Sequence, residues 1–256
     1  MAAAHDRLAA LHRARLTPQP TGTGSRVRCV DIVLIAGLWL PRSIWADVGA
    51  ELEHLGHRAL PVALPGVDDA STTATLADQV TATLAAVDAA DRPIVVGHSA
   101  ACTLAWMIAD QRPDVIDRVA LVGGFPSSDG DTYADFFPTV DGAMPFPGWG
   151  PFEGPDSVDL GQAERDRIVS IAVAVPEGVS KGIVRLTDER RFDVPVLLVC
   201  PEFSPDQAKA WINAGDVPEL SRATDVAYED IDSGHWPMVT RPAELARILD
   251  SAAAPG

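Results

Sequence analysis

One serine of this sequence stands where a nucleophile could be held. Ser99 is the third residue of the stretch GHSAA at positions 97–101, which follows the apolar run 94–96 and precedes an apolar, helix-like segment at 103–108. A strand, a sharp turn with a serine at its tip and a helix form the context of a G-x-S-x-G nucleophile elbow. The last position must be small so that the helix can pass close to the strand, and it is Ala101 here instead of glycine. The motif predicts a nucleophile, and the alternative is a small-residue turn that only packs a helix on a sheet.

A histidine at the same sheet edge would supply the base that such a serine needs. A serine hydroxyl is a poor nucleophile until a base removes its proton. His235 follows a C-terminal apolar run, in a Gly-His-Trp-Pro loop before the last helical segment. The other five histidines lie near the N-terminus, around a helix end or beside the serine itself: His5, His12, His54, His57 and His98. We therefore interpret His235 as the base, against the alternative of a structural loop histidine.

The elements around these residues predict an α/β fold. Near-continuous apolar runs typical of buried strands cover residues 27–35, 58–64, 94–96, 118–123, 194–200 and 226–231. Segments with helical periodicity separate them, and we expect Ser43 and Ser204 to cap two of these helices. Helical crossovers between apolar strands indicate a mostly parallel, doubly wound sheet with helices on both faces.

The regular pattern stops after Gly124. Residues 125–152 carry five of the seven phenylalanines, mixed with proline and glycine, which excludes regular helix or strand. These aromatic side chains either anchor an insertion to the core or line a substrate site, and both roles are compatible. We expect residues 160–190 to be helical. The predicted organisation is an N-terminal helix and linker at 1–25, a core at 26–124 and 191–256, and a cap insertion at 125–190.

Composition and charge restrict the partners. The formal net charge of −16 argues against nucleic acid and anionic membranes, which demand a basic surface. No apolar run approaches the roughly 18–20 residues of a membrane helix, and charged residues interrupt the N-terminus where a signal peptide would need an apolar core. The expected partner is a small-molecule substrate with an apolar portion, and a homodimer is left open.

The cysteines and the missing motifs restrict location and cofactors. Cys29, Cys102 and Cys200 are odd in number and lack C-x-x-C spacing, so we interpret them as reduced core residues of a cytoplasmic protein. The sequence has no P-loop, no G-x-G-x-x-G and no H-E-x-x-H. We therefore expect neither a metal nor a cofactor.

The elbow, the order serine, acid, histidine and the Gly-His235 loop before a last helix are similar to the α/β-hydrolase superfamily. Within it the chain resembles small single-domain esterases and hydroxynitrile lyases over about residues 26 to 253. The resemblance implies an α/β-hydrolase fold with a small cap. It also implies an oxyanion hole formed by the backbone N–H groups of Leu38 and Ala100. Family members carry His-Gly where this sequence has Ala36-Gly37, but backbone donors do not require that histidine.

The acid of the triad is the position where the sequence departs from the family. The resemblance implies an aspartate a few residues after the 194–200 strand, and the sequence reads CPEFSPD there. Glu202, at the strand end, is the first choice. Asp206 falls in the first turn of a helix, where the helix dipole alone explains an acid, and Asp129 follows the preceding strand at a distance. The absence of any acid is the fourth alternative.

Together these features favour a serine hydrolase that cleaves a carboxylic ester, thioester or lactone of a small, partly apolar substrate. Ser99 would attack, His235 would move the proton and Glu202 would orient the histidine. Two alternatives keep the fold. In the first, the histidine acts as a base without an acyl-enzyme, as in hydroxynitrile lyases and cofactor-free oxygenases of this fold. In the second, the chain is a non-catalytic ligand-binding relative.

Overall fold

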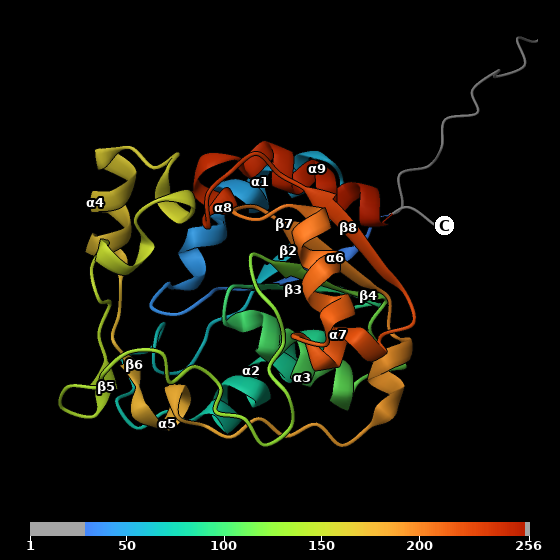
Figure 1. Ribbon diagram of the computed structural model, residues 1–256, viewed down its shortest axis with the longest axis horizontal. Helices are drawn as coiled ribbons and strands as arrows, with labels where there is room; N and C mark the ends of the chain where they lie inside the picture. Colours follow the sequence, from blue (N-terminus) through green and yellow to red (C-terminus); the bar gives the residue numbers. More distant parts are fainter. Residues whose placement is uncertain (1–28, 254–256) are drawn as a thin grey trace, which may run out of the picture.

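A parallel β-sheet forms the centre of the computed structural model, which describes residues 29–253. Its six strands follow the order β2-β1-β3-β4-β7-β8, and each strand is parallel to its neighbours (Figure 1). The strands are β1 (Asp31–Ile35), β2 (Arg58–Pro61), β3 (Ile94–His98), β4 (Arg118–Val122), β7 (Val196–Cys200) and β8 (Val226–Asp230). This topology confirms the predicted parallel α/β sheet. The helix and linker predicted at residues 1–25 lie outside the described residues.

Helices cover both faces of the sheet, which is why the central strands are apolar on both sides. Alternate residues of β1 enter two different cores: Val33 and Ile35 join one, and Ile32 and Leu34 join the other. Figure 1 shows the two layers. One layer contains α1 (Ala46–His54), α8 (Pro237–Thr240) and α9 (Pro242–Ala253). The opposite layer contains α2 (Leu76–Asp88), α3 (Ala101–Gln111), α6 (Pro205–Ala214) and α7 (Pro218–Arg222).

Of the two helix caps predicted from the sequence, one is present and one is absent. Ser204 caps α6 in a reciprocal capping box with Gln207, as the sequence predicts. The prediction that Ser43 caps a helix is wrong. Ser43 lies inside the 3-10 turn η1 (Arg42–Trp45), in which the Ile44 N–H donates to the carbonyl of Pro41, and α1 begins only after this turn, without a side-chain cap.

Residues 125–190, referred to below as the cap segment, are largely irregular. They contain β5 (Ala143–Met144), β6 (Val175–Pro176), α4 (Gln162–Ile171), α5 (Glu177–Ser180), η2 (Gly150–Phe152) and η3 (Pro155–Ser157). The prediction of helix across 160–190 is therefore only partly right. Helix α4 ends at Ile171. Val175 pairs with Met144 in an antiparallel two-stranded sheet. Pro176 has no backbone N–H and would interrupt a helix at this point.

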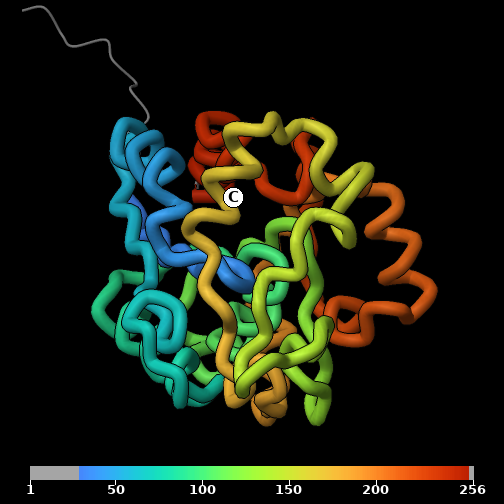
Figure 2. Tube along the Cα trace, turned by 90° about the vertical axis from the view of Figure 1, so that its left-hand side faces the viewer, coloured from blue at the N-terminus to red at the C-terminus, as the bar shows by residue number. Residues whose placement is uncertain are grey.

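The cap segment crosses the carboxyl ends of the sheet strands. Figure 2 faces this segment, whose yellow-green to orange trace runs across the front of the molecule. Trp39, just after β1, donates its indole N–H to the Met144 carbonyl at 3.1 Å and accepts at its own carbonyl from the Val173 N–H at 2.8 Å. The His235 N–H, after β8, donates to the Asp156 carbonyl at 2.7 Å. These bonds place the cap segment over the edge at which Ser99 lies.

The cysteines differ from the prediction at one position. Cys102 and Cys200 are buried, free thiols, as expected for core residues. Cys29 is exposed, because it precedes β1 instead of lying within the buried strand. Within residues 29–253, no helix is long and apolar enough to cross a membrane.

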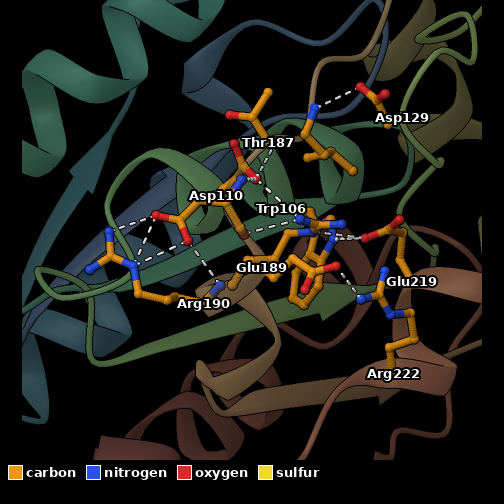
Figure 3. A network of polar contacts seen from close by, with 11 residues as sticks. Trp106, Asp110, Asp129, Thr187, Glu189, Arg190, Glu219 and Arg222 are labelled. Atoms are coloured by element: carbon orange, nitrogen blue, oxygen red, sulfur yellow. Dashed lines mark hydrogen bonds and ion pairs between the residues drawn. The ribbon is translucent and has the colours of Figure 1, made fainter.

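A buried ionic network joins the end of the cap segment and the residue that follows it to the core (Figure 3). Arg191, in η4 (Glu189–Asp193), donates from Nε to Glu219 at 2.9 Å and from a terminal nitrogen to Asp110 at 3.3 Å. Asp110, on α3, also accepts the backbone N–H groups of Thr187 and Asp188. The Trp106 indole N–H donates to Glu219 at 2.9 Å. The network therefore fixes the returning chain against the helix that carries the serine elbow.

We expect Arg191→Met to destabilise the protein by about 3–5 kcal/mol, because it leaves Asp110 and Glu219 buried without their cation. Urea unfolding followed by circular dichroism measures the loss. The matched control is Arg167→Met, which removes an exposed ion pair with Asp47 at 3.5 Å and should change the unfolding free energy by less than about 1 kcal/mol. Equal losses in the two variants would contradict this interpretation.

Candidate functional site

Ser99 lies at the tip of a sharp turn between β3 and α3. Its φ angle is +55°, in the left-handed region that a non-glycine residue rarely adopts. Two glycines make the turn sterically accessible. A Cβ atom at position 97 would lie 2.3 Å from the Ala101 carbonyl oxygen, and one at position 124 would lie 2.6 Å from the Ser99 carbonyl oxygen. The Ser99 N–H donates to the Val122 carbonyl at 2.8 Å, so the turn is also bonded to β4.

Ser99, His235 and Glu202 form one hydrogen-bonded chain. His235 Nε2 lies 2.8 Å from Ser99 Oγ, and its Nδ1 lies 2.7 Å from Glu202 Oε1. A carboxylate only accepts, so the Nδ1 proton is donated to Glu202 and Nε2 accepts the serine hydroxyl proton. The His235 and Glu202 side chains are 13% and 15% exposed, which limits competition from water. The arrangement can remove a proton from Ser99 and stabilise the resulting imidazolium.

The other two carboxylates considered from the sequence are placed elsewhere. Asp129 accepts the Leu186 N–H at 2.9 Å, within the cap segment (Figure 3). Asp206 lies in the first turn of α6, where its side chain is 95% exposed beside Lys209. Among the described residues, Glu202 is the carboxylate that hydrogen-bonds His235.

The backbone around Leu38 lies directly against the elbow. A Cβ atom at position 37 would be 2.8 Å from the buried Nδ1 of His98 and 3.2 Å from Ser99 Cβ, so glycine at this position permits the close approach. Leu38 and Ser99 line one cavity. In the part of the chain that the structure describes, the N–H groups of Leu38 and Ala100 have no hydrogen-bond acceptor. Two such N–H groups beside the serine can stabilise an oxyanion.

Aromatic side chains line the cavity beside Ser99. Phe146 and Phe152 of the cap segment line it together with Trp39 and Trp236 of the core. Ring centroids are 5.4 Å apart for Trp39 and Phe146, and 5.5 Å apart for Phe152 and Trp236. These phenylalanines therefore both anchor the cap segment and line the cavity. Phe125 instead stacks on Phe203, with centroids 5.2 Å apart.

The cavity is small. Its volume is about 20 Å³, which is room for about one water molecule. A larger molecule would fit here only if the aromatic side chains that line the cavity shifted.

The cavity surroundings are neutral or acidic. The residues that line it include no lysine or arginine. Asp156 of the cap segment lies near the triad, and burial raises the pKa of its carboxyl, an effect that His235 opposes and the charge of Glu202 reinforces. Within the described residues, no cluster of three histidine, cysteine, aspartate or glutamate side chains is arranged to hold a metal ion.

His98 is the site residue that the sequence analysis set aside. Its Nε2 lies 2.7 Å from the His235 carbonyl oxygen, and its side chain is buried at 1% exposure. Burial and, to a smaller extent, the neighbouring His235 lower the pKa of His98 to about 3, although the hydrogen bond to the carbonyl opposes the shift. The imidazole is therefore neutral at physiological pH. The available sequence signal was its position next to the serine, at the end of a buried strand.

Comparisons with known proteins agree with this architecture. A family model described as "Alpha/beta hydrolase family" matches residues 32–248. No curated protein matches the sequence.

Solved structures share the fold at low sequence identity. An extracellular alpha/beta-hydrolase from a Paenibacillus species aligns with a TM-score of 0.68 and 18% identity, covering 87% of this chain and 98% of that one. A methylesterase from Arabidopsis aligns with a TM-score of 0.67 and 13% identity, covering 87% and 98%. A pyrethroid hydrolase from Sphingobium faniae aligns with a TM-score of 0.64 and 18% identity, covering 88% and 98%.

The buried, neutral His98 predicts a loss of stability in mild acid. In the unfolded chain its pKa is near the ordinary value for histidine of 6.5, and in the folded chain it is about 3. Below pH 6.5 the unfolded state therefore binds a proton that the folded state excludes, and stability falls as the pH decreases. Between pH 7 and pH 5 we expect the wild type to lose about 2 kcal/mol more unfolding free energy than His98→Gln. Urea titrations at both pH values measure it, and an equal loss in the two proteins would contradict the assignment.

Proposed function

Since the chain belongs to the alpha/beta hydrolase family, we propose that it is a serine hydrolase that cleaves a carboxylic ester, thioester or lactone of a small, partly apolar substrate. The observation that carries this proposal is the continuous hydrogen-bonded chain from Ser99 Oγ through the imidazole of His235 to Glu202. A purely structural turn would not require a strained serine whose hydroxyl meets the imidazole of a loop residue 136 positions away.

In the proposed reaction, Ser99 Oγ attacks the substrate carbonyl carbon while His235 Nε2 takes its proton. The carbonyl oxygen becomes an oxyanion that the N–H groups of Leu38 and Ala100 bind. The tetrahedral intermediate then expels the alcohol or thiol, which receives the proton from His235, and the acyl group stays on Ser99. Water attacks this acyl-enzyme with His235 again as base, and the acid product leaves with Ser99 restored.

The role we assign to Glu202 is to hold His235 in the productive tautomer and to stabilise its positive charge after the serine proton is taken. A glutamate side chain is one methylene longer than that of aspartate, and Glu202 stands only two residues after the end of β7. The longer side chain lets an acid on this short connection reach Nδ1.

The lining of the cavity supports a neutral substrate with an apolar portion. Phe146, Phe152 and Ile168 offer apolar contacts from the cap segment, and Leu40 and Trp236 offer them from the core. The carboxylates Glu202 and Asp156 near His235 disfavour an anionic group close to the reacting carbonyl.

A fluorophosphonate probe followed by mass spectrometry tests the nucleophile. We expect one adduct on Ser99 in the folded wild type and none in Ser99→Ala, because only an activated serine reacts rapidly. A folded wild type without a Ser99 adduct would overturn the proposal and favour a ligand-binding protein. Hydrolysis of a p-nitrophenyl ester panel that survives Ser99→Ala would overturn it in another way, by pointing to histidine-base chemistry without an acyl-enzyme.

Isosteric substitution of the carboxylates tests the acid. We expect Glu202→Gln to lower kcat on a p-nitrophenyl ester by roughly 10³–10⁴-fold, because an uncharged amide does not stabilise the imidazolium and can donate to Nδ1, which reverses the tautomer of the histidine. The matched controls are Asp129→Asn and Asp206→Asn, whose kcat values should stay within about two-fold of the wild type. A comparable loss in either control, or a Glu202→Gln kcat within ten-fold of the wild type, would refute the assignment.

A further inference from the structure

His98 occupies the narrow space between the elbow and the loop that carries His235. It is the last residue of β3 and directly precedes Ser99. Its ring centroid lies 4.9 Å from that of His235 and 6.5 Å from that of Trp45. The ring is therefore wedged between two elements of the candidate site and the core behind them.

The two nitrogens of His98 have different surroundings. Nε2 lies 2.7 Å from the His235 carbonyl oxygen, which can only accept, so Nε2 carries the proton. Nδ1 is buried and has no hydrogen-bond partner among the described residues. A charged imidazole would place a second proton on this nitrogen with nothing to receive it, and burial keeps the ring neutral. His98 therefore has a single tautomer and a single ring orientation, in which Nε2–H donates to the His235 carbonyl.

The unpartnered side of the ring faces the turn before Leu38. A Cβ atom at position 37 would lie 2.8 Å from His98 Nδ1 and 3.1 Å from the His98 carbonyl oxygen. The ring therefore sets how closely the Gly37-Leu38 turn approaches the serine. One side chain touches the turn proposed to bind the oxyanion and the loop proposed to carry the base.

The backbone of His235 is held by two hydrogen bonds of different origin. Its N–H donates to the Asp156 carbonyl of the cap segment at 2.7 Å. Its carbonyl accepts from His98, which belongs to the central strand. Because His98 belongs to β3, its bond to the His235 carbonyl is the one that does not depend on the cap segment.

We propose that His98 is a positioning residue for the hydrolase reaction. Its Nε2–H holds the His235 loop at hydrogen-bonding distance from Ser99 independently of the cap segment, and its ring holds the Leu38 N–H in register with the serine. This inference rests on the proposed function, since it assigns His235 as the base and the Leu38 N–H as an oxyanion donor.

Three variants separate the hydrogen bond of His98 from its bulk. His98→Phe keeps an aromatic ring without the donor, whereas His98→Gln places an amide donor near the position of Nε2. The control His57→Phe removes another buried imidazole, which bonds Asp250 on α9 at 2.8 Å near the start of β2. Initial rates on a p-nitrophenyl ester and rates of fluorophosphonate labelling are measured for each folded variant.

We expect His98→Phe to lower kcat by about 10- to 100-fold with KM within two-fold, because the base is displaced while the substrate contacts remain. His98→Gln should restore kcat to within about three-fold of the wild type, and His57→Phe should leave it unchanged. The labelling rates should follow kcat. Wild-type kcat in folded His98→Phe, or equal losses in His98→Phe and His98→Gln, would overturn the proposal.

If His98→Phe does not fold, nitrogen NMR of the wild type with labelled histidines tests the proposal, because it reports the tautomer of His98. We expect the neutral Nε2–H tautomer of His98 between pH 8 and pH 5, and an Nδ1–H tautomer would overturn the proposal. Failure of the proposed function has another signature. In that case the wild type itself forms no Ser99 adduct, whereas a wrong role for His98 leaves that adduct intact and the His98→Phe rates unaffected.

Discussion

The close approach of α3 to β3 is the constraint on which the site depends. Ser99 adopts its positive φ angle only because the chain reverses within a turn where Gly97 meets the carbonyl of Ala101 and Gly124 meets the carbonyl of Ser99. A strained residue persists when its surroundings leave it no alternative. Here the surroundings are α3, which is buried from Ala101 to Asp110, and the parallel strands on either side of β3. The packing of the core therefore holds Ser99 in its strained conformation.

The site is assembled from loops that the parallel sheet brings to one edge. Leu38 follows β1, Ser99 follows β3, Glu202 follows β7 and His235 follows β8, so the carboxyl end of a different strand supplies each group. Open parallel sheets bind their ligands at this edge. The cap segment closes over it, and its aromatic side chains leave almost no free volume above the serine. Exclusion of water strengthens the hydrogen bonds from Ser99 to Glu202.

Helix α3 connects the turn that carries Ser99, at its start, to the ionic network near its end. Its first residues hold Ser99 in place, and Asp110 near its other end receives the backbone of Thr187 and Asp188 and the guanidinium of Arg191. A buried network of this kind contributes little net stability, but the loss of one partner leaves the others buried without compensation. The chain that leaves the cap segment is thereby fixed to the same helix that follows Ser99.

The sequence by itself determined the parallel α/β sheet, the turn that carries Ser99 and the loop that carries His235, because these depend on local periodicity, crossover lengths and short motifs. It did not determine which carboxylate meets His235, since Glu202 and Asp129 both follow strands and only the course of their connections directs one toward the imidazole and the other toward Leu186. Nor did it reveal the bond from His98 to a carbonyl 137 residues away, or that Cys29 is exposed. Side-chain direction and exposure depend on contacts between segments far apart in the chain, and only the tertiary structure decides them.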